Sequence, residues 1–255
     1  MILTVDVGNT QIKMAGFKGL EMIFFARMKT DHNKTEDEYA MMMEQMVQMK
    51  YSASVTFDGG IISCVVPKLT ETLKKAALLA FGCDLKTVGA GLKTGLNIRI
   101  ENPQAVGSDL VCSAVAALSA YPPPLMIVSL GSATTFTALD ANGSFLGGSI
   151  MPGVDISLAA LAEKTAQLPA IGLYSPEKAI CGRTSDCINA GMIYGTASAI
   201  DGMIARYEQE IGSKLTVLAT GGNAAAIVPY CTRNVIIEDH LVLRGLALIY
   251  ARNKK

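Results

Sequence analysis

Two stretches of the 255-residue chain decide its fold: TVDVGNTQIKMAGF at residues 4–17 and IVSLGSATTFTALD at residues 127–140. Each begins with strand-like alternation, turns at a glycine that threonine soon follows, and continues as a second strand. The two stretches lie about 120 residues apart, close to the expected size of a domain. This weak internal repeat predicts two related lobes that face each other across a cleft.

The residues around the first stretch predict alternating strands and helices. A capping box of Thr35 and Glu38 marks the start of one helix, and Pro67 begins another that Gly82 ends. Strands are expected at residues 1–6, 11–17, 21–27, 59–66 and 85–88. This alternation indicates an α/β layer structure.

The second half of the chain repeats the scheme. Helices are expected at about 104–121, 186–209 and 239–252, and strands at 125–129, 134–139, 145–151 and 215–220, with a hairpin turn at Asn142 and Gly143. We therefore predict an α/β protein with an N-terminal lobe at residues 1–110 and a C-terminal lobe at residues 111–255.

Composition excludes several classes of protein. Half of the residues are hydrophobic and 17% are charged, so the chain can build substantial cores, and 22 basic against 22 acidic residues indicate no nucleic-acid or membrane-surface partner. The longest uncharged stretch, residues 110–139, is interrupted by Pro122 to Pro124 and by Gly131, which favours a helix, a turn and strands over a membrane span. No signal peptide is evident, and we expect a cytoplasmic protein.

The cysteine pattern argues against a metal site. None of the six cysteines forms a CxxC pair, and the only histidines are His32 and His240. A zinc site or a Cys/His nucleophile system is therefore not expected. We interpret the cysteines as reduced thiols in the core.

The first candidate site is the glycine turn Asp6-Val7-Gly8-Asn9-Thr10, with Lys13 after it. A glycine turn lets backbone amides approach phosphate oxygens, Asn9, Thr10 and Lys13 supply donors, and Asp6 can hold a hydrated magnesium ion. The alternative is an ordinary hairpin that Asp6 and Asn9 stabilise.

Two further segments carry candidate residues. Gly221-Gly222-Asn223 follows a predicted strand, where it would admit an adenine ring or a phosphate, or would be a short turn with Asn223 as N-cap. In the segment from Asn102 to Asp109, Gly107 frees space and Asp109 places a carboxylate on an otherwise apolar helix. Asp109 is a candidate general base, or an acid that only favours the helix dipole.

Together these motifs resemble those of the type III pantothenate kinases, which belong to the superfamily of acetate kinase, sugar kinases, heat-shock chaperones and actin. The resemblance covers essentially the whole chain in the right order. It rests on DVGNT with Lys13, TGLNIR at 94–99, NPxxVGxD at 102–109, LGSATTF at 130–136, LGGSIMPG at 146–153 and CGRTSDCINAGMIYG at 181–195.

The resemblance implies two ribonuclease H-like lobes and the ATP-dependent phosphorylation of the primary hydroxyl of pantothenate, the first step towards coenzyme A. It also implies a homodimer that uses Mg²⁺ and a monovalent cation, K⁺ or NH₄⁺. The positions that match the family place the ATP phosphate loop at residues 6–13 and make Asp109 the proton acceptor. They place nucleotide contacts at Ser132, Gly221 and Gly222, and substrate contacts at Ile100, Gly107, Ser108, Asp109, Leu110 and Thr184.

The sequence departs from this family pattern at the site. Leu110 stands where the family has a substrate-binding arginine, and Ser129 stands where it has a carboxylate that helps to bind the monovalent cation. Ser132 replaces threonine, Ile100 replaces an aromatic residue and Arg183 replaces asparagine. A hydrogen bond to a charged group contributes about 1.5 to 3 kcal/mol, so losing the arginine alone would weaken substrate use roughly tenfold to more than a hundredfold.

Three functions follow as hypotheses. The chain is an active pantothenate kinase with a reshaped pocket, or a noncatalytic homologue that pairs with an intact paralogue. The third is a kinase for another small hydroxyl compound, for which Ile100 and Leu110 make a more apolar pocket.

Overall fold

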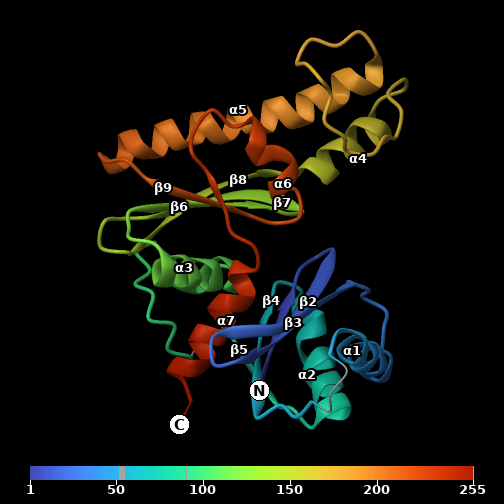
Figure 1. The fold of residues 1–255 in the computed structure, drawn as a ribbon, viewed down its shortest axis with the longest axis vertical. Coiled ribbons are helices and arrows are strands. Elements are labelled where there is room, and N and C mark those ends of the chain that lie inside the picture. Colours follow the sequence, from blue (N-terminus) through green and yellow to red (C-terminus); the bar gives the residue numbers. More distant parts are fainter. Residues whose placement is uncertain (52–54, 90, 255) are drawn as a thin grey trace. The chain divides into compact units, whose positions relative to one another are not determined.

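The computed structural model describes residues 1–51, 55–89 and 91–254 and divides into two compact units (Figure 1). The first unit comprises Met1–Leu96, Glu101–Ser119 and Leu241–Lys255, and the second comprises Asn97–Ile100 and Ala120–His240. Neither unit is therefore a continuous piece of chain, whereas the sequence analysis predicts two continuous lobes with one boundary at residue 110.

A five-stranded mixed sheet forms the centre of the first unit, in the order β3-β2-β1-β4-β5. The first three strands are antiparallel neighbours, and β4 and β5 run parallel to β1. The strands are β1 (Ile2–Val7), β2 (Gln11–Lys18), β3 (Glu21–Lys29), β4 (Gly59–Cys64) and β5 (Leu85–Thr87).

The second unit repeats this topology with a sheet in the order β8-β7-β6-β9-β10. Again two antiparallel hairpins are followed by strands parallel to the first one, β6. The strands are β6 (Leu125–Leu130), β7 (Ala133–Leu139), β8 (Phe145–Pro152), β9 (Thr216–Thr220) and β10 (Ile236–Ile237). The repeat that was predicted from residues 4–17 and 127–140 is thus confirmed, because β1 and β6 occupy the same place in their sheets.

Helices cover both faces of the first sheet. Residues of α1 (Glu36–Lys50) and α2 (Pro67–Phe81) share one hydrophobic core with the side chains of Leu3, Val5 and Val7. Residues of α3 (Ser108–Ala120) and α7 (Leu241–Arg252) share a second core with Ala15, Phe17 and Ile61. Since side chains alternate along a strand, Asp6 lies on the α3 and α7 face of β1.

In the second unit, the core joins the sheet to α4 (Val154–Lys164), α5 (Thr184–Ile211) and α6 (Ala224–Ile227). The long helix α5 runs across one face of this sheet (Figure 1). Short 3₁₀ turns complete the fold, η1 (Pro103–Ala105) in the first unit and η2 (Val228–Tyr230) in the second.

Most predicted elements are present, including the capping box of Thr35 and Glu38 and the left-handed Gly82 that ends α2. The uncharged stretch 110–139 folds as part of α3 followed by β6 and β7, and the search of the described residues found no helix suited to crossing a bilayer. The prediction missed α4, η2 and β10, whereas the helix expected after Asn223 is present as the short α6. The expectation that all six cysteines lie in the core was also wrong: Cys187 is exposed, only Cys83 and Cys112 are buried, and the other three are partly exposed.

Candidate functional site

Hydrogen bonds to Gln11 and Thr30 hold the glycine turn after β1 in its conformation. The N–H of Gly8 donates to the carbonyl oxygen of Gln11 at 3.0 Å, and the hydroxyl of the buried Thr30 donates to the carbonyl oxygen of Gly8 at 2.7 Å. The backbone N–H of Thr30 also donates to the carbonyl oxygen of Thr10 at 3.0 Å. Asn9 and Thr10 are exposed at the tip of the turn. Thr30, which directly follows β3 and which the sequence analysis missed, therefore fixes the turn.

Asp6 is a buried carboxylate between two polar neighbours. It pairs with Lys13 on β2 and with Ser63 on β4, and only 7% of its surface is exposed. Burial raises the pKa of Asp6 from 3.8 to about 7; the charge of Lys13 opposes this rise and that of Asp109 adds to it. Lys13 and Asp109 are therefore both close enough to Asp6 for their charges to act on its carboxyl group.

Asp109 is the second residue of α3, and the surrounding backbone leaves room for it. The carbonyl oxygen of Gly107 accepts from the amides of Leu110 and Val111 at 3.1 and 3.2 Å, which starts the helix. A Cβ at Gly107 would lie 2.5 Å from a carboxylate oxygen of Asp109, so any side chain there would displace it. Burial raises the pKa of Asp109, and the backbone amides of Leu110 and Asp109 itself act against this rise.

A hydrogen bond between two hydroxyl groups joins the segment of Asp109 to the strand beside Asp6. The oxygens of Ser63 and Ser108 are 2.8 Å apart, and Ser63 is fully buried. Ser63 therefore links β4 to the first residue of α3. The sequence analysis did not identify Ser63, because a single serine in an apolar strand has no distinguishing pattern.

The second unit has its own group of predicted residues at the turn after β6. Ser129 pairs with Thr135 and Thr220 in the sheet, as Asp6 pairs with Lys13 and Ser63 in the first unit. The predicted residues are Ser129, Ser132, Gly221 and Gly222, and Gly131 and Gly153 lie beside them.

Close backbone contacts hold this turn together. A Cβ on Gly153 would lie 2.4 Å from the carbonyl oxygen of Ser132, and one on Gly221 would lie 2.5 Å from that of Leu130. Gly221 also has a φ of 104°, which only glycine adopts easily. The structure thus brings Ser132 and Gly221 to the same end of the sheet.

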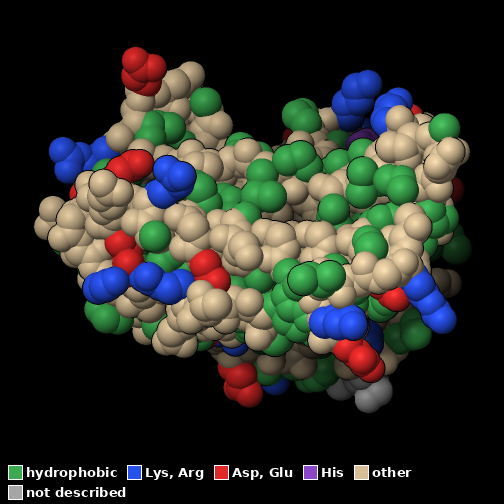
Figure 2. Space-filling model, turned by 90° about the horizontal axis from the view of Figure 1, so that it is seen from above, with side chains coloured by type: hydrophobic (Ala, Val, Ile, Leu, Met, Phe, Trp, Pro, Cys, Tyr) green, Lys and Arg blue, Asp and Glu red, His purple; other side chains and the backbone are tan. Residues whose placement is uncertain are grey.

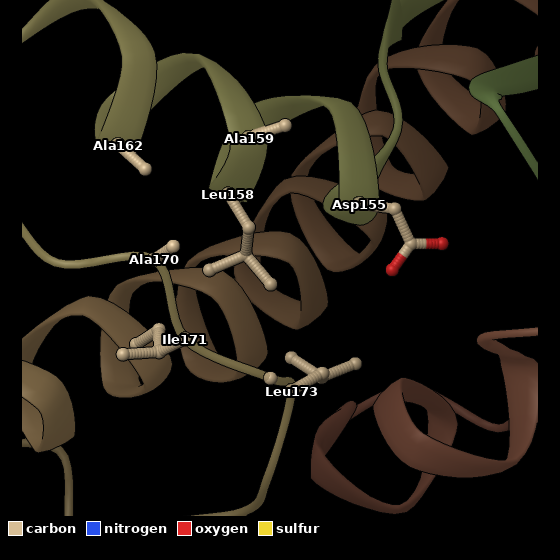
Figure 3. A pocket seen from close by; sticks show the side chains of 8 residues that line it. Asp155, Leu158, Ala159, Ala162, Ala170, Ile171 and Leu173 are labelled. Carbon is tan, nitrogen blue, oxygen red and sulfur yellow. The ribbon is translucent and has the colours of Figure 1, made fainter.

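Asn223 occupies the N-cap position of α6, as predicted, but its side chain makes a different bond. Its amide donates to the carboxylate of Asp155 at 3.1 Å, and no side-chain capping bond forms. Asp155 lies at one end of a cavity of about 270 Å³ between α4 and residues 170–173. Figure 3 shows Leu158 of α4 pointing toward the segment that carries Leu173. The cavity is otherwise apolar, so Asp155 is its one charged group.

The remaining predicted contacts also lie in the second unit. Thr184 is the exposed first residue of α5, and Arg183 before it is the N-cap residue without a side-chain cap bond. Ile100 is partly buried and ends the segment Asn97–Ile100, in which Ile98 makes an isolated bridge with Phe145.

The turns after β1 and β6 differ in how well they fit the ions that the resemblance implies, Mg²⁺ and a monovalent cation. Mg²⁺ prefers oxygen ligands and keeps several waters, so one carboxylate such as Asp6 suits it. At the equivalent position, Ser129 offers a hydroxyl, and the hydroxyl oxygens of Thr134 and Thr135 are buried without a hydrogen-bond partner in the described structure. A search of the described residues found no group of three or more His, Cys, Asp or Glu side chains that could hold a metal ion. Ser129 itself therefore supplies no negative charge to the monovalent cation that the resemblance implies.

Comparison with protein families gives a match to the model for type III pantothenate kinase over residues 2–206. The chain belongs to this family. It is 37% identical to the type III pantothenate kinase of Moorella thermoacetica over 99% of this chain and 100% of the relative. It is 38% identical to that of Exiguobacterium over the whole of both chains.

A solved structure confirms the fold. The activator of 2-hydroxyisocaproyl-CoA dehydratase from Clostridium difficile, solved with bound ADPNP, superposes with a TM-score of 0.56 at 14% identity, covering 99% of this chain and 94% of that one. At this identity the similarity shows a shared two-lobed α/β architecture, as expected for type III pantothenate kinases, and nothing about ligands.

Proposed function

We propose that this chain is an ATP-dependent kinase that phosphorylates pantothenate to 4'-phosphopantothenate for coenzyme A synthesis. The observation that carries the proposal is the grouping of Asp109 with Asp6 and Lys13 beside a glycine turn, in a chain that belongs to the type III pantothenate kinase family. Phosphoryl transfer needs an acid-base group and neutralisation of phosphate charge, and these three side chains supply both.

Each of these residues has a distinct proposed role. Lys13 would neutralise phosphate oxygens, and Asp6 would hold the water shell of Mg²⁺. ATP with Mg²⁺ would supply the phosphoryl group. Asp109 would accept the proton of the substrate hydroxyl, for which its raised pKa makes it a better base than an ordinary aspartate. Since the N–H of Gly8 is bonded to Gln11, we expect Gly8 to contribute space rather than a donor.

The other family positions have supporting roles in this proposal. Ser132, Gly221 and Gly222 would contact the nucleotide, and the tight backbone at Gly221 supports a close approach. Ile100, Gly107, Ser108, Leu110 and Thr184 would line the substrate site. Ser129 gives no charged ligand, and we derive no step through a monovalent cation.

A noncatalytic role is the second candidate, and the side chains at residues 110 and 129 favour it. Leu110 cannot bind the carboxylate of pantothenate as the family arginine would, and Ser129 cannot hold a cation by charge. In this hypothesis the chain pairs with an intact paralogue and contributes part of a site. A kinase for a less polar hydroxyl compound is the third hypothesis, which the apolar Ile100 and Leu110 support.

One experiment separates these functions. Purified protein is mixed with ATP, Mg²⁺, K⁺ and pantothenate, and phosphopantothenate is measured by mass spectrometry. Product from the chain alone, lost in Asp109→Asn but kept in the exposed control Asp84→Asn, supports the kinase. The noncatalytic subunit is supported if this chain alone gives no product and product forms after an intact paralogue is added. Phosphorylation of a different small alcohol, with none of pantothenate, supports the third function.

We further propose that the chain acts in the cytoplasm as a homodimer, or as a heteromer with a paralogue. Support comes from the exposed side of α5, where Gly191, Gly195 and Gly202 have open space around them. Figure 2 shows hydrophobic side chains, with uncharged side chains and backbone, across the middle of one face, and charged side chains mostly toward its edges. Light scattering tests this: Gly195→Arg should reduce a dimeric mass to that of one chain, and an unchanged mass would exclude this face.

A further inference from the structure

Two thiols flank the segment that begins α5. Cys181 lies in the irregular chain before the helix, Cys187 lies in the first turns of the helix, and Arg183 and Thr184 lie between them. Cys187 is exposed and Cys181 is partly exposed. Both thiols are therefore open to small molecules.

The two cysteines are already in contact. The thiol of Cys187 donates to the carbonyl oxygen of Cys181 at 3.2 Å. A carbonyl oxygen lies about 2.4 Å from the Cα of its own residue, so the Cys187 sulfur lies within about 6 Å of the Cα of Cys181. The thiol of Cys181 donates to the carbonyl oxygen of Lys178 at 3.1 Å, and a rotation about its Cα–Cβ bond would redirect it.

The backbone around the pair can adjust. A disulfide joins Cα atoms about 4.4 to 6.8 Å apart, and residues 177–183 have no helix or strand that would resist a small shift. Partial burial raises the pKa of Cys181, and the nearby Cys187 and Asp186 raise it further. This influence of Cys187 agrees with the short distance between the two side chains.

The other cysteines offer a contrast. Cys83 and Cys112 are buried, and burial raises the pKa of Cys83 to about 11 and that of Cys112 well above its usual value. Burial likewise raises the pKa of Cys231 to about 11. A reactive thiol needs exposure and an accessible thiolate. Cys187 is the one cysteine of the six that is exposed, whereas Cys64, Cys181 and Cys231 are partly exposed.

We propose that Cys181 and Cys187 form a reversible disulfide by exchange with a small-molecule disulfide such as oxidised glutathione. The Cys187 thiolate attacks one sulfur of the small disulfide, whose S–S bond breaks and releases one small thiolate. The Cys181 thiolate then attacks the Cys187 sulfur of this mixed disulfide and releases the second small thiolate. The two protein thiols are oxidised to one disulfide, and their two protons leave with the two small thiols.

The disulfide would close a loop around Thr184. If Thr184 contacts the substrate, a consequence that rests on the proposed function, the oxidised protein will bind pantothenate more weakly than the reduced protein. The modification itself does not depend on that function, because mass spectrometry detects it directly.

The test uses the full-length protein incubated with oxidised glutathione at pH 8. We expect the intact mass to fall by two hydrogens per chain, a Cys181–Cys187 cross-linked peptide after digestion, and full reversal by dithiothreitol. Cys181→Ser should stop at a single glutathione adduct on Cys187. Cys231→Ser is the matched control and should form the cross-link as the unaltered protein does.

Three results would overturn the proposal: a stable glutathione adduct on Cys187 of the unaltered protein, a cross-link that involves another cysteine, or two free thiols after prolonged incubation. Calorimetric titration of oxidised and reduced protein with pantothenate then tests the consequence for binding. A cross-link without any change in pantothenate affinity would leave the modification site established and exclude the effect on substrate binding.

Discussion

Replacing Asp6 with asparagine should stabilise the ligand-free protein at alkaline pH while it abolishes phosphoryl transfer. Only 7% of the surface of Asp6 is exposed in the first sheet, and burial raises its pKa by more than the charge of Lys13 lowers it. Asparagine has nearly the same shape and carries no charge. The variant thus removes a buried negative charge that is useful only when a cation is bound.

The size of the change in the free energy of unfolding follows from the pKa of Asp6, which rises from 3.8 to about 7 on folding. One pKa unit corresponds to about 1.4 kcal/mol, so ionised Asp6 reduces the free energy of unfolding by about 4 kcal/mol at pH 8. Because the folded-state pKa is the higher one, this carboxyl group favours folding most below pH 4, and its contribution is lost as the pH rises to about 7. Allowing for the burial of the amide, we expect Asp6→Asn to gain about 2 to 4 kcal/mol at pH 8.

Thermal unfolding of both proteins at pH 5 and pH 8 measures this difference. At pH 8 the variant should unfold roughly 5 to 15 °C higher than the unaltered protein, and at pH 5 the gain should largely vanish. The exposed Asp84 on the same unit gives the control, since Asp84→Asn should show no such pH dependence. Destabilisation by Asp6→Asn at pH 8, or an equal gain at both pH values, would refute the argument from burial.

Three further predictions concern the reaction. Asp109→Asn should lower kcat by roughly 10² to 10⁴ without changing ATP affinity measured by calorimetry, as expected for loss of a general base; a variant with full turnover would exclude that role. Leu110→Arg combined with Ser129→Asp should raise kcat/KM for pantothenate by roughly tenfold or more. Unchanged kinetics would mean that the pocket has diverged beyond these two contacts. Ser63→Ala removes the hydroxyl that is hydrogen-bonded to Ser108. It should lower kcat severalfold while the circular dichroism spectrum stays unchanged, because a hydrogen bond worth about 1 kcal/mol that positions the start of α3 is lost. An altered spectrum would indicate a general role in folding instead.

Sequence reasoning recovered the parts of this protein that depend on local pattern. The alternation in residues 4–17 predicted β1, the glycine turn and β2, and the second copy predicted β6 and β7. Pairing across such hairpins depends on turn geometry and hydrophobic alternation, both of which are visible in sequence. The candidate acids Asp6 and Asp109 were also found this way, because a charged residue is conspicuous in an apolar segment.

The missed features depend on contacts between distant segments. Thr30 and Ser63 look like ordinary polar residues, and only the folded chain brings them to Gly8 and Ser108. The extent to which burial raises the pKa of Asp6 depends likewise on the helices that cover its sheet. Cys187 was assigned to the core because cysteine is usually buried, yet its place in the first turns of α5 leaves it exposed.

The last helix of the chain completes the first unit. Leu243, Leu246 and Ile249 of α7 are buried in the core with Phe17 and Ile61, and the helix contacts β1, β2 and β4. A ribosome makes these residues only after it has made the whole of the second unit. On this face the sheet that carries Asp6 is therefore covered by α3 alone while more than a hundred later residues are synthesised. A truncation or fusion that disturbs α7 would consequently also disturb the glycine turn of Gly8, which is distant from α7 in the sequence.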